Sequence, residues 1–264
     1  MNIQKFKCIQ CGQCCSHIRG MISEEEKNFL KEYAYGKLPL VQLFPIERMS
    51  FPLFDFEAKR FKEWQKGVNI NAKIEPSRVI FDLDRKKSIV FTYYMDYDSC
   101  PFLKDKKCLI YDKKRAFICR LFPFNKGPFL KTGEDLKKED MFGSCPSIKD
   151  IIPRLNDADN KEFVKQLHES FGDDLLNIIE YDYLTEWINK LIVTLIKNKK
   201  IRPAMNYPYD YLLKRINNSQ KIDLMDFLVE EGIKTREEVE RLIYRFDNNI
   251  DAGDKLKSQF STIL

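Results

Sequence analysis

Eight cysteines fall into two groups, and the first group is the run CIQCGQCC at residues 8–15. A C-x2-C turn lets two thiolates converge on one metal, and a third cysteine after two more residues is the spacing typical of iron-sulfur ligation. Four-thiolate sites need four cysteines each, so eight cysteines allow two metal sites, or one site with spare thiols. The candidate metal ligands are Cys8, Cys11, Cys14, Cys15, Cys100, Cys108, Cys119 and Cys145.

Disulfides are the competing use of these cysteines. A chain of 264 residues with 44% hydrophobic residues can bury a sizeable core without covalent cross-links. Residues 1–7 do not resemble a secretion signal, and the most apolar stretch, residues 191–196, is too short to cross a bilayer. We therefore expect a cytoplasmic protein with no membrane partner, in which the cysteines bind metal.

The charge distribution does not indicate a nucleic-acid partner. The net charge of +5 arises from 45 basic and 40 acidic residues that are mixed along the whole chain, and no long basic stripe is present. Basic residues do concentrate at residues 104–115. We interpret them as a solvated face or as compensation for thiolate charge rather than as a docking surface.

A β-hairpin is predicted immediately before the second cysteine group. Residues 79–83 and 89–94 are rich in β-branched and aromatic side chains, and the polar residues 84–87 between them suit a turn. A capping box that begins at Ser23 predicts a short helix that ends near Gly36. Because residues 38–76 contain several prolines, we expect an irregular segment there, with one helix over residues 56–66.

Beyond residue 150 the pattern becomes helical. Apolar residues recur at helical spacing over residues 163–171, and helices are also expected over residues 184–197 and 222–229. Thr235 and Glu238 form a further capping box, which precedes an apolar stripe that runs to Phe246. We predict an α+β fold: a cysteine-rich metal-binding module with a β-hairpin and short helices over residues 1–150, followed by an all-helical region over residues 151–264.

The identity of the metal is left open by the spacing. A cysteine followed by proline often supplies the fourth ligand of a ferredoxin-type run, and Cys100 and Cys145 are both of this kind. Adjacent side chains diverge, so Cys14 and Cys15 should seldom bind the same mononuclear ion. The second group lacks the second C-x2-C knuckle of a zinc ribbon. We therefore favour one or two iron-sulfur clusters of the 4Fe-4S type and keep zinc as the alternative.

Three residues near Cys119 are candidates for binding or tuning a cofactor. Tyr111, Arg115 and Cys119 are spaced four residues apart, so a helix here would put them on one face, and Arg120 follows directly. Guanidinium groups would offset thiolate charge and donate hydrogen bonds to sulfur; the alternative is that Arg115 or Arg120 clamps an anionic substrate. His17 is interpreted as a donor to the ligands, and His168 as structural.

Taken together, these motifs resemble the YkgJ-type cysteine-cluster family, a zinc- or iron-chelating domain. The matching residues are the run at 8–15, CPFL at 100–103, C-x-IY-x3-R at 108–115 and CR-x-FPF at 119–124. The resemblance spans residues 8–146, and Ala116 stands where the family usually has proline. It extends to flagellin lysine-N-methylases, which implies S-adenosylmethionine as a candidate cofactor and a protein as a candidate substrate. No glycine pair typical of a nucleotide-binding loop is present, and Ile18 stands where radical S-adenosylmethionine chemistry would need a third cysteine.

Two functional hypotheses follow. The first is an iron-sulfur protein with a redox role, or with a protein-modifying role of the lysine N-methylase kind. The alternative is a binding module in which zinc holds the fold together and the helical region engages a protein partner.

Overall fold

The computed structural model describes residues 5–16, 24–48, 50, 52–112, 115–124, 143, 145–156 and 160–254. The chain forms two compact units, each built from separate stretches. The cysteine unit consists of Met1–Cys14, Lys106–Asn189 and Arg241–Leu264, and the sheet unit consists of Cys15–Asp105 and Lys190–Glu240. This division by compactness differs from the predicted boundary at residue 150, which stays a prediction.

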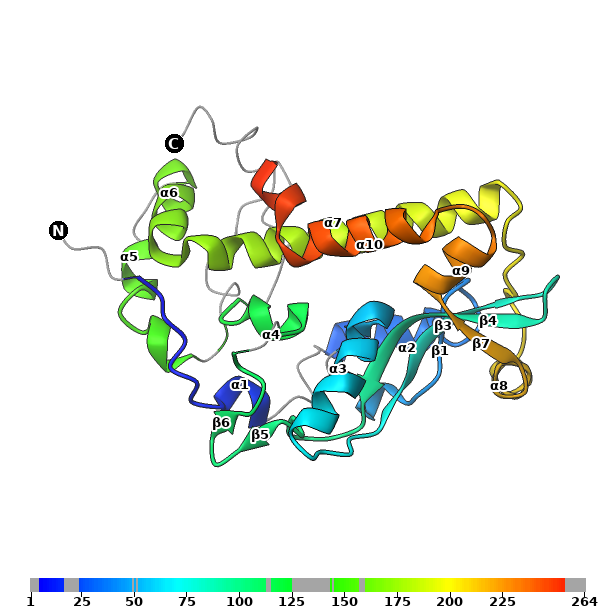
Figure 1. The fold of residues 1–264 in the computed structure, drawn as a ribbon, viewed down its shortest axis with the longest axis horizontal. Coiled ribbons are helices and arrows are strands. Elements are labelled where there is room, and N and C mark those ends of the chain that lie inside the picture. Colours follow the sequence, from blue (N-terminus) through cyan, green and yellow to red (C-terminus); the bar gives the residue numbers. More distant parts are fainter. Residues whose placement is uncertain are drawn as a thin grey trace. The chain divides into compact units, whose positions relative to one another are not determined.

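The described residues form a mixture of helices and short strands (Figure 1). The helices are α1 (Gln13–Ser16), α2 (Glu24–Tyr33), α3 (Asp55–Gly67), α4 (Phe117–Leu121), α5 (Ile152–Asn156), α6 (Asn160–Phe171), α7 (Asp173–Lys197), α8 (Tyr209–Asn217), α9 (Leu224–Glu230) and α10 (Arg236–Asp247), with short 3-10 helices η1 (Ile46–Arg48) and η3 (Pro146–Ile148). The strands are β1 (Val41–Gln42), β2 (Leu53–Phe54), β3 (Ile74–Asp82), β4 (Lys87–Met95), β5 (Leu103–Lys104), β6 (Lys107–Cys108) and β7 (Gln220–Asp223). This confirms the predicted α+β class, with a hairpin before the second cysteine group and a C-terminal region that is mainly helical.

The sheet unit is organised around the predicted hairpin. Strands β3 and β4 pair antiparallel, with Val79 opposite Val90 and Ile80 opposite Ile89, and β1 and β2 add on either side. The side chains of Val79, Ile80, Ile89 and Val90 are fully buried. Since neighbouring residues of a strand point to opposite faces, both faces of the hairpin are covered.

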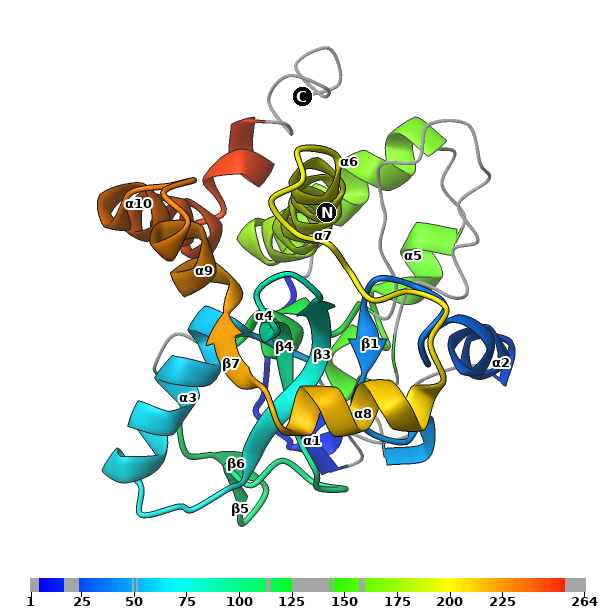
Figure 2. The same cartoon turned by 90° about the vertical axis from the view of Figure 1, so that its right-hand side faces the viewer.

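Strand β7 is the one departure from an all-helical C-terminal region in the described residues. It pairs parallel to β4, with Ile89 opposite Ile222, so the helix predicted over residues 222–229 starts only at Leu224. The prediction was wrong at residues 222 and 223 because pairing with a distant strand overrides the local apolar pattern. Helix α8 packs on the sheet through a cluster that includes Val79, Leu212 and Ile216 (Figure 2).

A buried carboxylate joins two helix starts in the sheet unit. Asp55 is 2% exposed and accepts hydrogen bonds from the backbone N–H groups of Phe56 and Met225, both at 2.8 Å. These groups lie in the first turns of α3 and α9, where backbone donors have no partner within the helix. Burial, with a smaller contribution from Asp223, raises the pKa of Asp55 to about 7, although both backbone donors lower it.

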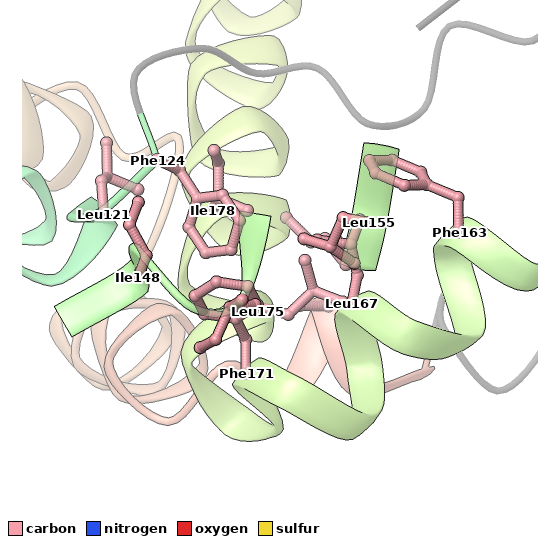
Figure 3. Packing of buried hydrophobic residues seen from close by; sticks show 12 residues of the cluster. Leu121, Phe124, Ile148, Leu155, Phe163, Leu167, Phe171, Leu175 and Ile178 are labelled. Carbon is pink, nitrogen blue, oxygen red and sulfur yellow. The ribbon is translucent and has the colours of Figure 1, made fainter. Parts of the chain in front are cut away.

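The core of the cysteine unit is helical. Leu167 and Phe171 of α6 lie beside Leu175 of α7, and Phe163 of α6 lies beside Leu155 (Figure 3). The remaining members of this cluster are Leu121, Phe124, Ile148, Ile151, Leu155, Ile178, Ile179 and Ala252. The core therefore joins α4, which carries Cys119, and η3, which follows Cys145, to α5, α6 and α7.

Several predicted helices are present with similar bounds. Helix α3 covers residues 56–66 and α6 covers residues 163–171, whereas α7 contains residues 184–197 but begins earlier than predicted, at Asp173. At α10 the capping box is formed: Glu238 N–H donates to the Thr235 hydroxyl at 3.2 Å, and Thr235 N–H donates to the Glu238 carboxylate at 2.7 Å. The capping box predicted at Ser23 lies outside the described residues, although α2 begins at Glu24.

None of the helices in the described part of the chain combines the length and the apolar character that a membrane span requires.

Candidate metal centre

All eight cysteines lie in the described part of the chain, each is half-buried, and none forms a disulfide. Six of them belong to the cysteine unit: Cys8, Cys11, Cys14, Cys108, Cys119 and Cys145. The other two, Cys15 and Cys100, belong to the sheet unit. Two boundaries between the units lie near cysteines in the sequence. One falls between Cys14 and Cys15, and the other falls in the turn between β5 and β6.

The first cysteine run is a tight loop that leads into α1. Gln10 and Gly12 have positive φ angles of 54° and 74°, a conformation that glycine adopts without steric cost and that turns the chain sharply. Before this loop, Phe6 N–H donates to the Ser170 carbonyl at 2.7 Å, and the Phe6 ring packs on Phe171 at 5.3 Å. The end of α6 therefore anchors the chain just ahead of Cys8.

Five thiols of the cysteine unit lie close enough to influence one another electrostatically. Burial is the main cause of the raised pKa of Cys108 and of Cys145; interaction with the ionised forms of Cys14 and Cys8 raises the pKa of Cys108 further, and interaction with those of Cys11 and Cys8 raises the pKa of Cys145 further. Three separate chain segments thus converge, and Cys8 is common to both sets. The two cysteine groups of the sequence thus approach each other at these five residues.

Burial is the largest influence on the two thiols from the second group. It raises the pKa of Cys108 and of Cys145, whereas the backbone N–H groups of Ile110 and Ser147, respectively, donate to the sulfurs and lower it. The positive charge of Arg115 also lowers the pKa of Cys108. Without a metal these thiols favour the neutral form, so metal binding must displace their protons.

Tyr111 and Arg115 lie beside these thiols. Burial raises the pKa of Tyr111, and a hydrogen bond to the Cys8 sulfur raises it further, because the phenol acts as the donor. The Arg115 guanidinium stacks over the Tyr111 ring at 4.5 Å and donates to the Cys119 carbonyl at 3.4 Å. A hydrogen-bond donor and a positive charge therefore adjoin the cysteines, as expected around metal-bound thiolates.

The helical face predicted for Tyr111, Arg115 and Cys119 is wrong. Tyr111 lies in a turn, closed by its N–H and the Cys108 carbonyl at 3.3 Å, and α4 begins only at Phe117. A turn, not a continuous helix, follows β6. The five-residue helix α4 forms only where Phe117 and Leu121 are buried, because so short a helix depends on packing. Tyr111 and Arg115 still meet, but through stacking.

Arg120 points into a different set of contacts. Its guanidinium stacks over Phe117 at 4.1 Å and donates to the Asn177 side chain at 3.4 Å and to the Asp247 carbonyl at 3.3 Å. These contacts connect α4 to α7 and α10. Within the described structure, Arg120 thus has a clear packing role, and its predicted role toward a cofactor stays a prediction.

Comparison with known families gives one match. The family model CxxCxxCC, described as "Putative zinc- or iron-chelating domain", matches residues 7–146. The chain belongs to the CxxCxxCC family. The match contains all eight cysteines, and it ends directly after Cys145 and Pro146. No curated protein and no solved structure matches the chain.

Cys14 and Cys15 are adjacent in the sequence but belong to different units. Cys100 N–H donates to the Cys15 carbonyl at 2.8 Å, which links these two cysteines in the sheet unit. His17 lies outside the described residues. His168 lies within α6 near its C-terminal end, where its carbonyl accepts from Gly172 N–H at 2.8 Å.

The thiols of the described residues are not arranged as a complete set of metal ligands. Among the described residues, no three His, Cys, Asp or Glu side chains are gathered closely enough to hold a metal ion. The five thiols are neighbours at the range of charge interactions, and a bound metal would have to draw some of them together.

Sequence reasoning missed Asp174, at the start of α7. Burial raises the pKa of this half-buried carboxylate, and the positive charge of Arg115 lowers it. Asp174 also raises the pKa of Tyr111. Its only sequence signal is the Asp173-Asp174 pair after Gly172, which is also what an ordinary helix start contains.

Proposed function

We propose that this CxxCxxCC protein binds a zinc or iron centre through thiols of the cysteine unit. The observation that carries the proposal is the convergence of Cys8, Cys11 and Cys14 with Cys108 and Cys145 from distant parts of the chain. Cys119, on α4 beside Arg115, is a further candidate ligand of the same unit. Thiolate donors suit zinc and iron-sulfur clusters and are poor ligands for magnesium or calcium.

The residues around the thiols fit such a centre. A site with four thiolates carries more negative charge than its metal neutralises. Hydrogen-bond donors and positive charges around the site stabilise this excess. Tyr111 supplies a donor to the Cys8 sulfur, and Arg115 supplies a positive charge near Cys108. Asp174 interacts with the Arg115 guanidinium and partly offsets its positive charge.

We propose an iron-sulfur cluster of the 4Fe-4S type as the resident centre. The C-x2-C-x2-C spacing of Cys8, Cys11 and Cys14 supports it, and Cys145, which is followed by Pro146, offers the remaining ligand in the same unit. Such a cluster would supply one-electron transfer. The hydrogen bond from Tyr111 and the charge of Arg115 would then raise the reduction potential, since both stabilise added negative charge.

A redox or protein-modifying role needs access to the centre. A cavity of about 470 Å³ opens beside Cys145 and is lined by Gln13, Gly143, Pro146, Ile148, Lys149 and Ile152. This cavity is where a reaction partner would reach the thiols of the cysteine unit. A bound S-adenosylmethionine and a protein substrate for methylation remain predictions that rest on the resemblance.

Anaerobic purification of the full chain tests the proposal. Brown protein with matching iron and sulfide contents supports the iron-sulfur cluster, and colourless protein with stoichiometric zinc supports the zinc-stapled binding module instead. Cys8→Ser should lose most of the metal, because Cys8 is common to both sets of interacting thiols. Cys100→Ser is the matched control, because it alters a thiol of the sheet unit. Full metal content in Cys8→Ser would refute the assignment to the cysteine unit.

A further inference from the structure

Glu180 of α7 is completely buried inside the cysteine unit, with 0% of its surface exposed. One carboxylate oxygen, Oε2, accepts the backbone N–H of Ala252 at 2.7 Å. The other oxygen, Oε1, has no hydrogen-bond partner in the described part of the chain. Because a buried charge is costly unless its oxygens are hydrogen-bonded, an ionised carboxylate fits poorly at this position.

The segment that Glu180 contacts is the turn after α10. Helix α10 ends at Asp247, Asn249 has a positive φ of 53°, and residues 250–254 form a short helical turn. Asparagine tolerates this left-handed conformation better than most residues. The Asn249 side chain also contacts α7, because its Nδ2 donates to the Asn177 Oδ1 at 3.1 Å.

The contact of Asn249 leaves a second buried oxygen without a donor. Arg120 donates to the Asn177 Oδ1 at 3.4 Å, which fixes the amide of Asn177 with its oxygen toward both donors. Asn249 must therefore turn its amide nitrogen to Asn177, and its own Oδ1 is buried without a partner among the described residues. Asn177 and Glu180 are one helical turn apart on α7, so the two unpartnered oxygens belong to neighbouring contacts. Both are acceptors, and a proton on Glu180 converts one of them into a donor.

Three charged side chains face Glu180 from the elements that pack against α7. Burial has the largest effect and raises the pKa of Glu180 from 4.5 to about 7. Asp251, in the segment itself, raises the pKa as well, whereas the Ala252 N–H, Arg245 of α10 and Arg120 of α4 lower it. The Arg245 guanidinium binds Asp251, so its positive charge is partly offset.

We propose that Glu180 is a pH-sensitive latch that holds residues 249–254 against α7. The latch is closed while Glu180 carries a proton, because the carboxyl group then has no buried charge and can donate a hydrogen bond. Ionisation favours release of the segment, because water then solvates the carboxylate. The latch does not depend on which metal the cysteine unit binds.

The pH range of the latch follows from the two states of Glu180. In the open segment the carboxyl group is solvated and has its ordinary pKa of 4.5, against about 7 in the closed segment. Opening is therefore rarest below pH 4.5 and rises about tenfold per pH unit above it. It levels off above pH 7 at roughly 300 times its value in acid.

Hydrogen–deuterium exchange of the full chain between pH 5 and pH 8, read by mass spectrometry of peptic peptides, measures this opening. The peptide that contains Ala252 reports on the segment, and a peptide from α6 reports on the rest of the cysteine unit. Each exchange rate is divided by the intrinsic rate at the same pH. Glu180→Gln cannot ionise, and Glu169→Gln is the matched control, because it changes a carboxylate of α6 that is 32% exposed.

The corrected exchange of the Ala252 peptide should rise at least about tenfold from pH 5 to pH 7 in the wild type and in Glu169→Gln. It should stay constant in Glu180→Gln, and the α6 peptide should show no such rise in the wild type. A rise that persists in folded Glu180→Gln would assign the effect to another group and overturn the proposal.

Two outcomes in the wild type alone would also overturn the proposal, so the test stands even if circular dichroism shows that Glu180→Gln does not fold. The first is a corrected exchange of the Ala252 peptide that does not change with pH. A buried water that donates to both oxygens would produce this outcome, because Glu180 could then stay ionised in the closed segment. The second is an equal rise in the α6 peptide, which would mean that the whole unit opens.

Discussion

Replacing Asp55 by asparagine should remove a pH-dependent loss of stability from the sheet unit. Asp55 is buried where α3 and α9 begin, and its two oxygens accept from the backbone N–H groups of Phe56 and Met225. Burial penalises the carboxylate and raises its pKa to about 7. The folded protein therefore binds a proton at Asp55 in a range where the unfolded chain, with an ordinary pKa of 3.8, has released it.

The magnitude follows from these two pKa values. A folded pKa of about 7 against 3.8 corresponds to on the order of 4 kcal/mol, at about 1.4 kcal/mol per pKa unit. Ionisation of buried Asp55 lowers the free energy of unfolding by this amount. The loss is absent below pH 4, grows as the pH rises, and is complete above pH 7. Asparagine avoids it but replaces one acceptor with an amide donor, which costs about 1–3 kcal/mol at every pH. Asp55→Asn should thus be less stable than the wild type at pH 4, and should equal or exceed it at pH 8.

Urea denaturation between pH 4 and pH 8, followed by tryptophan fluorescence, measures this difference. Trp64 reports on α3, because it packs against Phe61 with ring centroids 5.1 Å apart. Asp84→Asn is the control, since this carboxylate is 55% exposed and paired with Arg202, and its difference from the wild type should stay small. A constant difference between Asp55→Asn and the wild type across this range would refute the reasoning. The backbone donors would then outweigh burial.

Three further predictions concern the cysteine unit. Tyr111→Phe removes the donor to the Cys8 sulfur and should weaken metal binding roughly 10- to 100-fold in chelator competition; unchanged affinity would contradict the contact. Arg120→Leu should lower the free energy of unfolding by about 1–2 kcal/mol in urea and leave metal content intact, because Arg120 contacts α7 and α10; loss of metal without loss of stability would show a direct role. Because burial raises the pKa of Cys108 and Cys145, metal affinity should fall as the pH drops from 8 to 6, and a pH-independent affinity would count against both as ligands.

Local patterns predicted the elements that local interactions determine. The hairpin of β3 and β4 has alternating β-branched and aromatic residues around a polar turn, and its strands are neighbours in sequence. The start of α10 was readable because Thr235 and Glu238 satisfy each other's backbone donors within one turn. In both cases the stabilising partners lie a few residues apart.

Distant partners determine what the sequence could not predict. Strand β7 has one buried residue, Ile222, which is too weak a pattern to predict a strand. Its partner β4 lies about 130 residues earlier in the sequence. The approach of Cys108 and Cys145 to Cys8 likewise depends on packing between distant segments. The metal-ligand spacing of residues 8–15 was visible, but which thiols of the second group join them was not.

The interleaving of the two units determines the order in which the protein can mature. The cysteine unit needs Met1–Cys14, Lys106–Asn189 and Arg241–Leu264, so its first stretch is synthesised long before its last. During translation Cys8, Cys11 and Cys14 emerge well before Cys108 and Cys145 exist, and the sheet unit is likewise incomplete until β7 is made. We therefore expect metal insertion to follow the synthesis of most of the chain. The matched segment 7–146, expressed alone, would lack α6, α7 and α10, on which the first cysteine run and α4 depend.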